Sequence, residues 1–147
     1  MNTYFNEKNL HAVDAKGRVI LSKEIRDRHG IKNGDILYCV PSLENPTYIE
    51  IRTASQWDLY FEALSKSEQG EEKKDARRFA SVAHDTATVD GQGRISIPQE
   101  IRRACRVAET VAVVDMGKHI EVWAKEHIEQ KYEEMVRAFK KLNDKIY

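Results

Sequence analysis

The chain has 147 residues and carries 24 basic and 24 acidic side chains, so its formal net charge is zero. It has no apolar run near the length of a membrane-spanning helix and no signal-peptide pattern, and its two cysteines, Cys39 and Cys105, form no CxxC pair. We therefore expect neither a membrane protein nor a disulfide scaffold, but one compact domain, or two small ones, in a reducing cytoplasm.

In chain order, the first half is predicted to contain four short strands and two helices. Apolar alternation places the strands at residues 11–13, 19–21, 36–40 and 48–51. A short helix follows the second strand, with Ser22 as its N-terminal cap and Gly30 as its left-handed end. Residues 33–35, Asn-Gly-Asp, mark a turn. A longer helix is expected from near Ser55, with one apolar face formed by Trp57, Tyr60, Phe61 and Leu64.

The polar segment Ser65–Ala76 is predicted to be the seam between two halves, either as a loop or as the polar end of a helix. The second half repeats the order of the first, with strands at residues 87–89, 95–97, 111–114 and 119–123. Pro98 fits the first turn of its short helix. The C-terminal helix has one apolar stripe, formed by Ile128, Tyr132, Met135, Val136, Phe139 and Leu142. This helix is longer than a small β core needs, so its stripe packs either on the chain's own sheet or on a neighbouring subunit.

One segment of fourteen residues occurs twice. Residues 13–26 read VDAKGRVILSKEIR, and residues 89–102, which lie 76 positions later, read VDGQGRISIPQEIR, with seven identical pairs. Such self-similarity indicates a tandem duplication. Each half alone, at roughly 70 residues, would have a marginal core, so we expect the two halves to pack together.

The repeated loop has the pattern Asp-x-x-Gly-Arg and lies between two predicted strands. Its glycine, Gly17 or Gly93, permits the positive φ that a sharp turn needs. The aspartate can accept hydrogen bonds from backbone N–H groups of its own turn and hold the arginine four residues later. Arg18 and Arg94 would then be fixed forks of donors that suit a phosphate or a guanine edge. The alternative is that each Asp–Arg pair only braces a turn, and the two roles are compatible.

Charge is unevenly distributed along this neutral chain. Residues 14–32 have six basic and three acidic groups, and residues 90–106 have four basic and two acidic groups. Lys16 adds a second charge to the first loop, whereas Gln92 takes its place in the second. A basic excess confined to the repeated units is the asymmetry that a polyanionic partner would need, although charge alone favours an ordinary solvated surface.

Other chemistry finds no support in the sequence. The segment Gly91-Gln92-Gly93 lacks the third glycine of a dinucleotide fingerprint, and there is no GxxxxGK[ST] or GxSxG motif. The five histidines have no metal-ligand spacing, and none lies near a cysteine in a zinc pattern. We therefore predict a protein that is not an enzyme, with no metal, no cofactor and no small-molecule substrate.

The order of strand, Asp-x-Lys/Gln-Gly-Arg loop, strand, Glu-Ile-Arg helix, Gly-Asp turn and strand resembles the AbrB-type swapped-hairpin DNA-binding module. Two tandem copies, together with the segments Arg77-Arg78-Phe79 and Ile120–Trp123, resemble the bacterial MraZ family over nearly the whole chain. Ser22 departs from the proline that the family usually has there. The resemblance implies a mainly β, α+β fold in which two AbrB-like halves form one pseudo-symmetric β-barrel core, each followed by an amphipathic helix. The halves would be residues 1–64 and 81–147, joined by a linker or helix extension at 65–80.

The resemblance also implies a function: a sequence-specific transcriptional regulator of the division and cell-wall gene cluster. It would bind short direct repeats of double-stranded DNA upstream of its own operon, as a ring-shaped homo-oligomer associated with the nucleoid in the cytoplasm. A ring would align the basic loops of a neutral subunit, so that several weak contacts add. The implied DNA contacts are Asp14, Lys16, Gly17, Arg18, Asp90, Gln92, Gly93 and Arg94, with secondary basic contacts at Lys23, Arg26, Arg102 and Arg103. The alternative is an antitoxin-like protein-interaction module.

Overall fold

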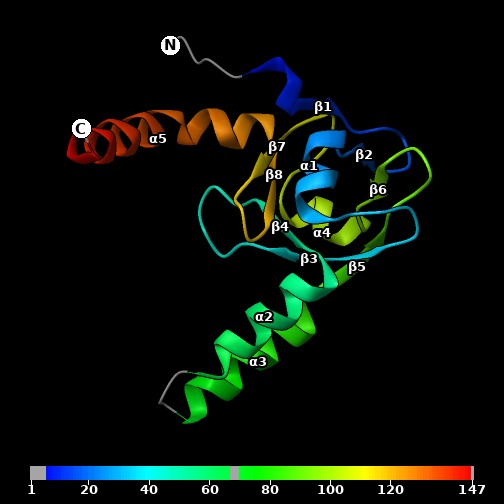
Figure 1. Ribbon diagram of the computed structural model, residues 1–147, viewed down its shortest axis with the longest axis vertical. Coiled ribbons are helices and arrows are strands. Elements are labelled where there is room, and N and C mark those ends of the chain that lie inside the picture. The colour runs from blue at the N-terminus through cyan, green and yellow to red at the C-terminus, as the bar shows by residue number, and fades with distance from the viewer. Residues whose placement is uncertain (1–5, 67–69, 147) are drawn as a thin grey trace.

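The computed structural model describes residues 6–66 and 70–146 and has a mixed α+β fold, which confirms the predicted class (Figure 1). A short 3-10 helix, Glu7–Asn9, precedes the first strand. The strands are β1 Leu10–Ala12, β2 Arg18–Ile20, β3 Ile36–Pro41, β4 Ile49–Arg52, β5 Asp85–Thr88, β6 Arg94–Ser96, β7 Thr110–Asp115 and β8 Ile120–Ala124. The helices are α1 Lys23–His29, α2 Ala54–Leu64, α3 Gly70–Ala83, α4 Gln99–Ala104 and α5 Lys125–Ile146.

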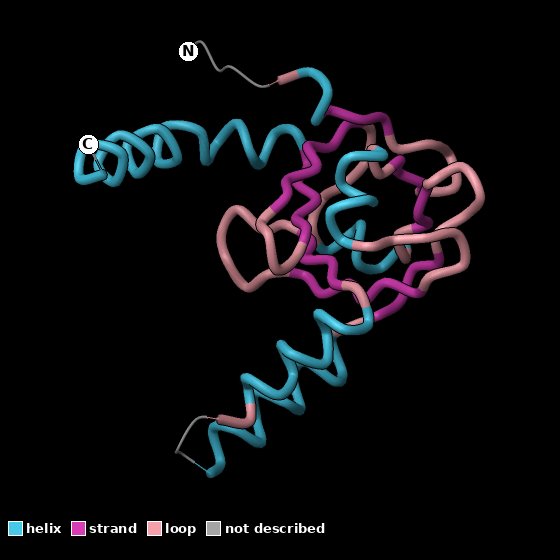
Figure 2. Tube along the Cα trace, viewed as in Figure 1, coloured by secondary structure: helices cyan, strands magenta, loops and turns pink. Residues whose placement is uncertain are grey.

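The strands form a rounded body from which two helical arms extend (Figures 1 and 2). One arm is the pair α2 and α3, which run side by side, and the other is α5. The short helices α1 and α4 lie within the outline of the body. The helical arms therefore do not cover the whole strand body, and the strands with their connecting loops form a surface of their own.

Six strands form one sheet in the order β1-β7-β8-β4-β3-β5, and β2 and β6 form a separate two-stranded ribbon. The predicted barrel is not closed by strand pairing within the described residues, because β1 and β5 are the edges of the sheet. Both edge strands are short, and the loop after each one leads the chain into the ribbon instead. The proposed domain division at residues 65–80 remains a prediction.

The strand pairing exchanges elements between the two repeats. β1 pairs with β7 of the second half, and β5 pairs with β3 of the first half. In the ribbon, β2 pairs antiparallel with β6, so that Val19 lies opposite Ile95. The repeats therefore form a joint core, as the marginal size of each half leads one to expect.

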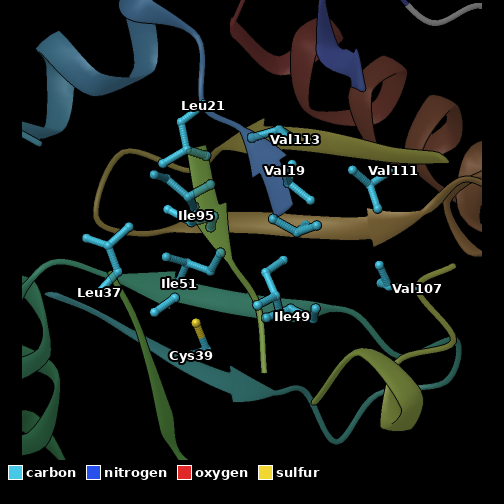
Figure 3. Packing of buried hydrophobic residues seen from close by; sticks show 14 of the residues in the cluster. Val19, Leu21, Leu37, Cys39, Ile49, Ile51, Ile95, Val107, Val111 and Val113 are labelled. Carbon is cyan, nitrogen blue, oxygen red and sulfur yellow. The ribbon is translucent and has the colours of Figure 1, made fainter. Parts of the chain in front are cut away.

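The core lies between the ribbon and the large sheet. Figure 3 shows Val19 and Ile95 of the ribbon pointing towards Ile49 and Ile51 of β4, with Val111 of β7 beside them. Each of these five side chains is fully buried. Burial of an aliphatic side chain of this kind stabilises a fold by about 1.5–3 kcal/mol, so this packing fixes the position of the ribbon.

The predicted ends of the short helices are largely confirmed. The Ser22 hydroxyl caps α1 by accepting a hydrogen bond from the N–H of Ile25 at 3.2 Å, and Gly30 ends this helix in the left-handed conformation. Pro98 lies at the N-cap of α4, one residue before the predicted first turn. Arg106, 76 residues after Gly30, takes the same left-handed conformation with a φ of 56°, which the sequence did not indicate.

The predicted apolar face of α2 packs on the sheet, whereas the predicted stripe of α5 is buried only at Ile128 and is exposed at Met135, Phe139 and Leu142. In α2, Trp57 is buried and stacks on Tyr38 with ring centroids 5.2 Å apart, and Thr53 forms a capping box with Gln56. Part of the predicted seam is the separate helix α3, whose Ala80 is buried in the same cluster; residues 67–69 of that seam lie outside the described residues. None of the helices described here is both long and apolar enough to cross a membrane.

Candidate nucleic-acid interface

The first repeated loop is organised around the carboxylate of Asp14. One oxygen, Oδ1, accepts hydrogen bonds from the backbone N–H groups of Lys16 at 2.9 Å and Arg18 at 2.8 Å. The other, Oδ2, accepts a hydrogen bond from Nε of Arg18 at 2.6 Å. The N–H of Gly17 closes the turn on the carbonyl oxygen of Asp14 at 2.9 Å. Both predicted roles of the aspartate, turn acceptor and holder of the arginine, are therefore present.

The second loop has the same set of hydrogen bonds. Asp90 accepts from the backbone N–H groups of Gln92 at 2.9 Å and Arg94 at 3.0 Å, and from Nε of Arg94 at 2.8 Å. The N–H of Gly93 closes this turn on the carbonyl oxygen of Asp90 at 3.0 Å. One loop geometry is thus built twice in the same protein.

The electrostatics of the two loops are also alike. The backbone N–H of Arg18, with its guanidinium and the N–H of Lys16, lowers the pKa of the Asp14 carboxyl, so that it stays ionised. The pKa of Asp90 is lowered in the same way, foremost by the backbone N–H of Arg94. Each aspartate holds its arginine through Nε, and the Nη groups of both arginines have no partner among residues 6–66 and 70–146. Two pre-set forks are therefore left for a ligand.

Both arginines lie on the outer face of the ribbon. Val19 and Ile95 point into the core, so their neighbours along β2 and β6 point the other way. Arg18 lies opposite Ser96 and Arg94 lies opposite Ile20, which separates the arginines by two positions, roughly 7 Å along the ribbon. The predicted loops, far apart in sequence, are thus brought to one surface.

Two further residues on this outer face were not predicted from the sequence. Ile20 is 43% exposed although it is apolar, and Ser96, at the equivalent position of the second copy, is also exposed. The alternation along each strand was the available signal, because Val19 and Ile95 were expected to be buried. Lys16 and Gln92 are both exposed at the loop tips.

The four secondary basic residues are placed differently. Lys23 and Arg103 are exposed on α1 and α4, and Lys23 pairs with Asp27 at 3.0 Å. Arg26 on α1 and Arg102 on α4 are partly buried. Nε of Arg26 donates to the carbonyl oxygen of Leu21, and Nε of Arg102 donates to that of Ile97, both at 2.9 Å; these two acceptors directly follow β2 and β6. The guanidinium groups of this second pair lie against the glycines of the loops.

Within residues 6–66 and 70–146, one group of side chains could hold a metal ion. Glu50, His119 and Glu121 each bring a ligand atom within 4.8 Å of the other two, on the face of the β4–β8 pair. One oxygen of each carboxylate already has a protein donor, since Arg52 donates to Glu50 at 3.0 Å and Trp123 donates to Glu121 at 2.8 Å.

Comparison with known proteins identifies relatives over most of the chain. The family described as "MraZ protein, putative antitoxin-like" matches residues 83–145. A protein of Finegoldia magna named transcriptional regulator MraZ is 30% identical over 133 residues, which cover 88% of this chain and 84% of that protein. Proteins with the same name from Dictyoglomus turgidum and Thermoanaerobacter are similar: the first is 29% identical over 92% of this chain and 91% of its own, the second 31% identical over 79% and 78%.

The match to the Dictyoglomus turgidum protein spans both copies of the loop, whereas the family description matches only the segment with the second copy. The similarity therefore extends over most of this chain and most of each relative, rather than over one shared module. The chain belongs to the MraZ family.

Proposed function

We propose that this protein is a sequence-specific DNA-binding transcriptional regulator that reads DNA with the outer face of the β2–β6 ribbon and the two loops beside it. The observation that carries the proposal is the duplicated Asp–Arg brace, which presents Arg18 and Arg94 diagonally across one face of the ribbon, with Nη groups that have no partner among the described residues. The relatives' name, transcriptional regulator, supports the same role.

The shape of this surface suits double-stranded DNA. A two-stranded antiparallel ribbon fits the major groove, where an arginine fork can bond O6 and N7 of guanine. The exposed Ile20 offers an apolar contact for a thymine methyl group, and Gln92 offers an amide for adenine. Lys16 supplies a charge for a phosphate. The two interlocked halves would thus act as one pseudo-symmetric reading unit.

A neutral subunit needs more than one such unit to bind DNA tightly, so we propose a ring-shaped homo-oligomer that binds short direct repeats upstream of its own operon, in the nucleoid. The exposed end of α5 supports self-assembly. Ile128 at its start is buried against the sheet, whereas Phe139, Leu142 and Ile146 are 69%, 59% and 75% exposed. Head-to-tail contacts through such a stripe close into rings and align the basic loops.

The second candidate is an antitoxin-like protein-interaction module, which the family description and the same exposed stripe of α5 favour. The two candidates differ in their response to salt. DNA contacts made through phosphates weaken steeply as salt rises. An apolar protein interface would survive high salt, so a polypeptide that co-purifies at 1 M salt would favour this candidate.

The test of the proposal is binding of the purified protein to a labelled fragment from immediately upstream of its own gene. A scrambled fragment of equal length is the control, and both are titrated at several salt concentrations. Binding that prefers the native fragment and needs its spaced repeats is the expected result. Equal, salt-sensitive binding to both fragments would leave only a general affinity for polyanions and would contradict the proposal.

A further inference from the structure

Arg102 of the second half lies against the loop of the first half. A Cβ atom built on Gly17 would overlap Cζ and Nε of Arg102, so the guanidinium occupies the space that any side chain at position 17 would need. The guanidinium is held there because its Nε donates to the carbonyl oxygen of Ile97 at 2.9 Å. Arg102 thus packs beneath a loop from the other repeat.

The reverse contact is also present. A Cβ atom on Gly93 would lie 2.7 Å from Cζ and Nε of Arg26, and Nε of Arg26 donates to the carbonyl oxygen of Leu21 at 2.9 Å. Arg26 and Arg102 are equivalent in the repeat, as are Gly17 and Gly93. The contact therefore occurs twice and always crosses between the halves.

Backbone hydrogen bonds follow the same crossed pattern. The N–H of Leu21 donates to the carbonyl oxygen of Gly93 at 2.9 Å, and the N–H of Ile97 donates to the carbonyl oxygen of Gly17 at 3.1 Å. The carbonyl oxygen of each glycine thus accepts a hydrogen bond from the other half, and the arginine of that other half packs against the same glycine. Each loop is therefore held in place by the opposite half.

We propose that Arg102 is a positioning residue for loop 14–18 and Arg26 a positioning residue for loop 90–94, each acting from the opposite half. Gly17 and Gly93 have φ values of 75° and 78°, a region that glycine enters and leaves at little cost. The flat guanidinium against each glycine restricts that freedom, and so fixes the direction in which Arg18 and Arg94 point. The DNA-binding arm of the test rests on the proposed function, whereas its first arm needs no DNA.

The first arm measures amide hydrogen exchange by NMR in the full-length protein without DNA. Arg102→Ala is expected to speed exchange about tenfold at residues 16–18 and to leave residues 92–94 unchanged. Arg26→Ala should do the reverse. Arg103→Ala, which removes an exposed arginine from the same helix, is the matched control and should change neither loop. Faster exchange in the loop of the variant's own half, or equally in both loops, would overturn the proposal.

The second arm is a double-mutant cycle on DNA binding. Arg102→Ala should weaken binding about tenfold. It should be non-additive with Arg18→Ala, because both act through the first loop, and additive with Arg94→Ala. The slope of affinity against salt should stay at the wild-type value, since no phosphate contact is lost.

Arg102→Lys separates shape from charge and guards against a variant that is merely unstable. Lysine keeps the charge but lacks the planar group, so it is expected to behave like alanine in both arms while melting at the wild-type temperature. Two results would make Arg102 a direct phosphate contact and overturn the positioning role. One is full recovery of DNA binding in Arg102→Lys, and the other is a salt slope that is lower by about 0.9 in Arg102→Ala than in the wild type. If the wild-type protein bound no DNA, the proposed function would fail, while the exchange measurement would still decide this inference.

Discussion

The two repeated loops agree in what lies beneath them and differ in what faces outward. Both have an Asp–Arg brace, a glycine turn and an arginine packed below the glycine, which is Arg102 for the first loop and Arg26 for the second. The exposed positions differ, because Lys16 is replaced by Gln92 and Ile20 by Ser96. The residues that set the loop geometry are therefore shared, together with Arg18 and Arg94, whereas the exposed positions around these arginines differ.

This difference makes the proposed DNA-binding surface asymmetric. The first copy offers a charge and an apolar side chain, and the second offers an amide and a hydroxyl. On DNA, the first set suits a phosphate and a thymine methyl group, and the second suits polar base edges. The two copies are expected to contribute the same arginine contact but different neighbouring contacts.

The largest effect is expected from removal of the shared arginines. Arg18→Ala and Arg94→Ala should each weaken binding to the native fragment roughly 10- to 100-fold, because each loses a charge-assisted fork. The double variant should lose specific binding altogether. Fluorescence anisotropy with native and scrambled fragments measures both effects.

The control is Arg78→Ala, which removes an arginine of the α2–α3 arm that is paired with Asp75 at 2.8 Å. It should bind like the wild type. Circular dichroism and sedimentation should show unchanged fold and assembly for all variants. Wild-type binding by the double variant would remove the ribbon from the interface.

The next largest losses of stability and DNA binding are expected from substitution of Gly17 and Gly93, the turn glycines that both loops share. Gly17→Ala and Gly93→Ala each place a Cβ at a left-handed φ, which costs about 1–2 kcal/mol, and each displaces the arginine packed below. We expect a lower melting temperature and weaker DNA binding in both variants. Gly117→Ala, at a φ of 84° in a loop with open space around it, should lower the melting temperature but leave binding unchanged. Equal losses of binding in all three variants would point to general instability.

A smaller effect should come from the exposed tips. Lys16→Gln makes the first loop resemble the second, and Gln92→Lys does the reverse. If Lys16 contacts a phosphate, its loss should lower the slope of log affinity against log salt by about 0.9 and weaken binding severalfold at moderate salt. Gln92→Lys should raise the slope by a similar amount only if the second tip also lies near a phosphate, so the pair of slopes locates each tip on the DNA.

Most of the local structure could be predicted from the sequence, because it depends on neighbouring residues. The Asp14 brace, the Ser22 cap and the Gly30 helix end all follow from short-range chemistry. The exchange of strands could not be predicted from the residues, because Val19 and Ile95 indicate only that each strand is half-buried, not which strand it pairs with.

The remaining differences have related physical causes. The sequence did not identify α3 as a separate helix, because residues 70–75 at its start carry no apolar side chain and only Ala80 of the helix is buried. Arg26 and Arg102 were predicted only as secondary basic contacts to DNA, since a sequence gives no sign that an arginine of one repeat lies beneath the loop glycine of the other repeat. Whether these two also touch DNA stays a prediction.

The smallest expected effect is a shift in the pKa values of Asp14 and Asp90, and it shows whether the two Asp–Arg braces stabilise their carboxylates equally. The pKa values of Asp14 and Asp90 are both lowered from 3.8, foremost by the backbone N–H of the arginine four residues later. A lowered folded-state pKa stabilises the loop above the ordinary aspartate range, and this stabilisation is lost as the pH falls through the lowered value. NMR titration of the two carboxyl carbons should therefore give midpoints below 3.8.

The variants sharpen this measurement, because the main cause of the shift is a backbone group. Arg18→Ala removes the guanidinium but keeps the N–H of residue 18, so the pKa of Asp14 should rise only part of the way to its ordinary value. Lys16→Gln keeps the backbone N–H of residue 16 and should leave it unchanged, as the same lowering at Asp90 beside Gln92 indicates. A full return in Arg18→Ala would mean that the side chain, rather than the turn, holds the carboxylate. The loops would then owe their geometry to the residue proposed to contact DNA, and binding could not be weakened at Arg18 without also loosening the turn.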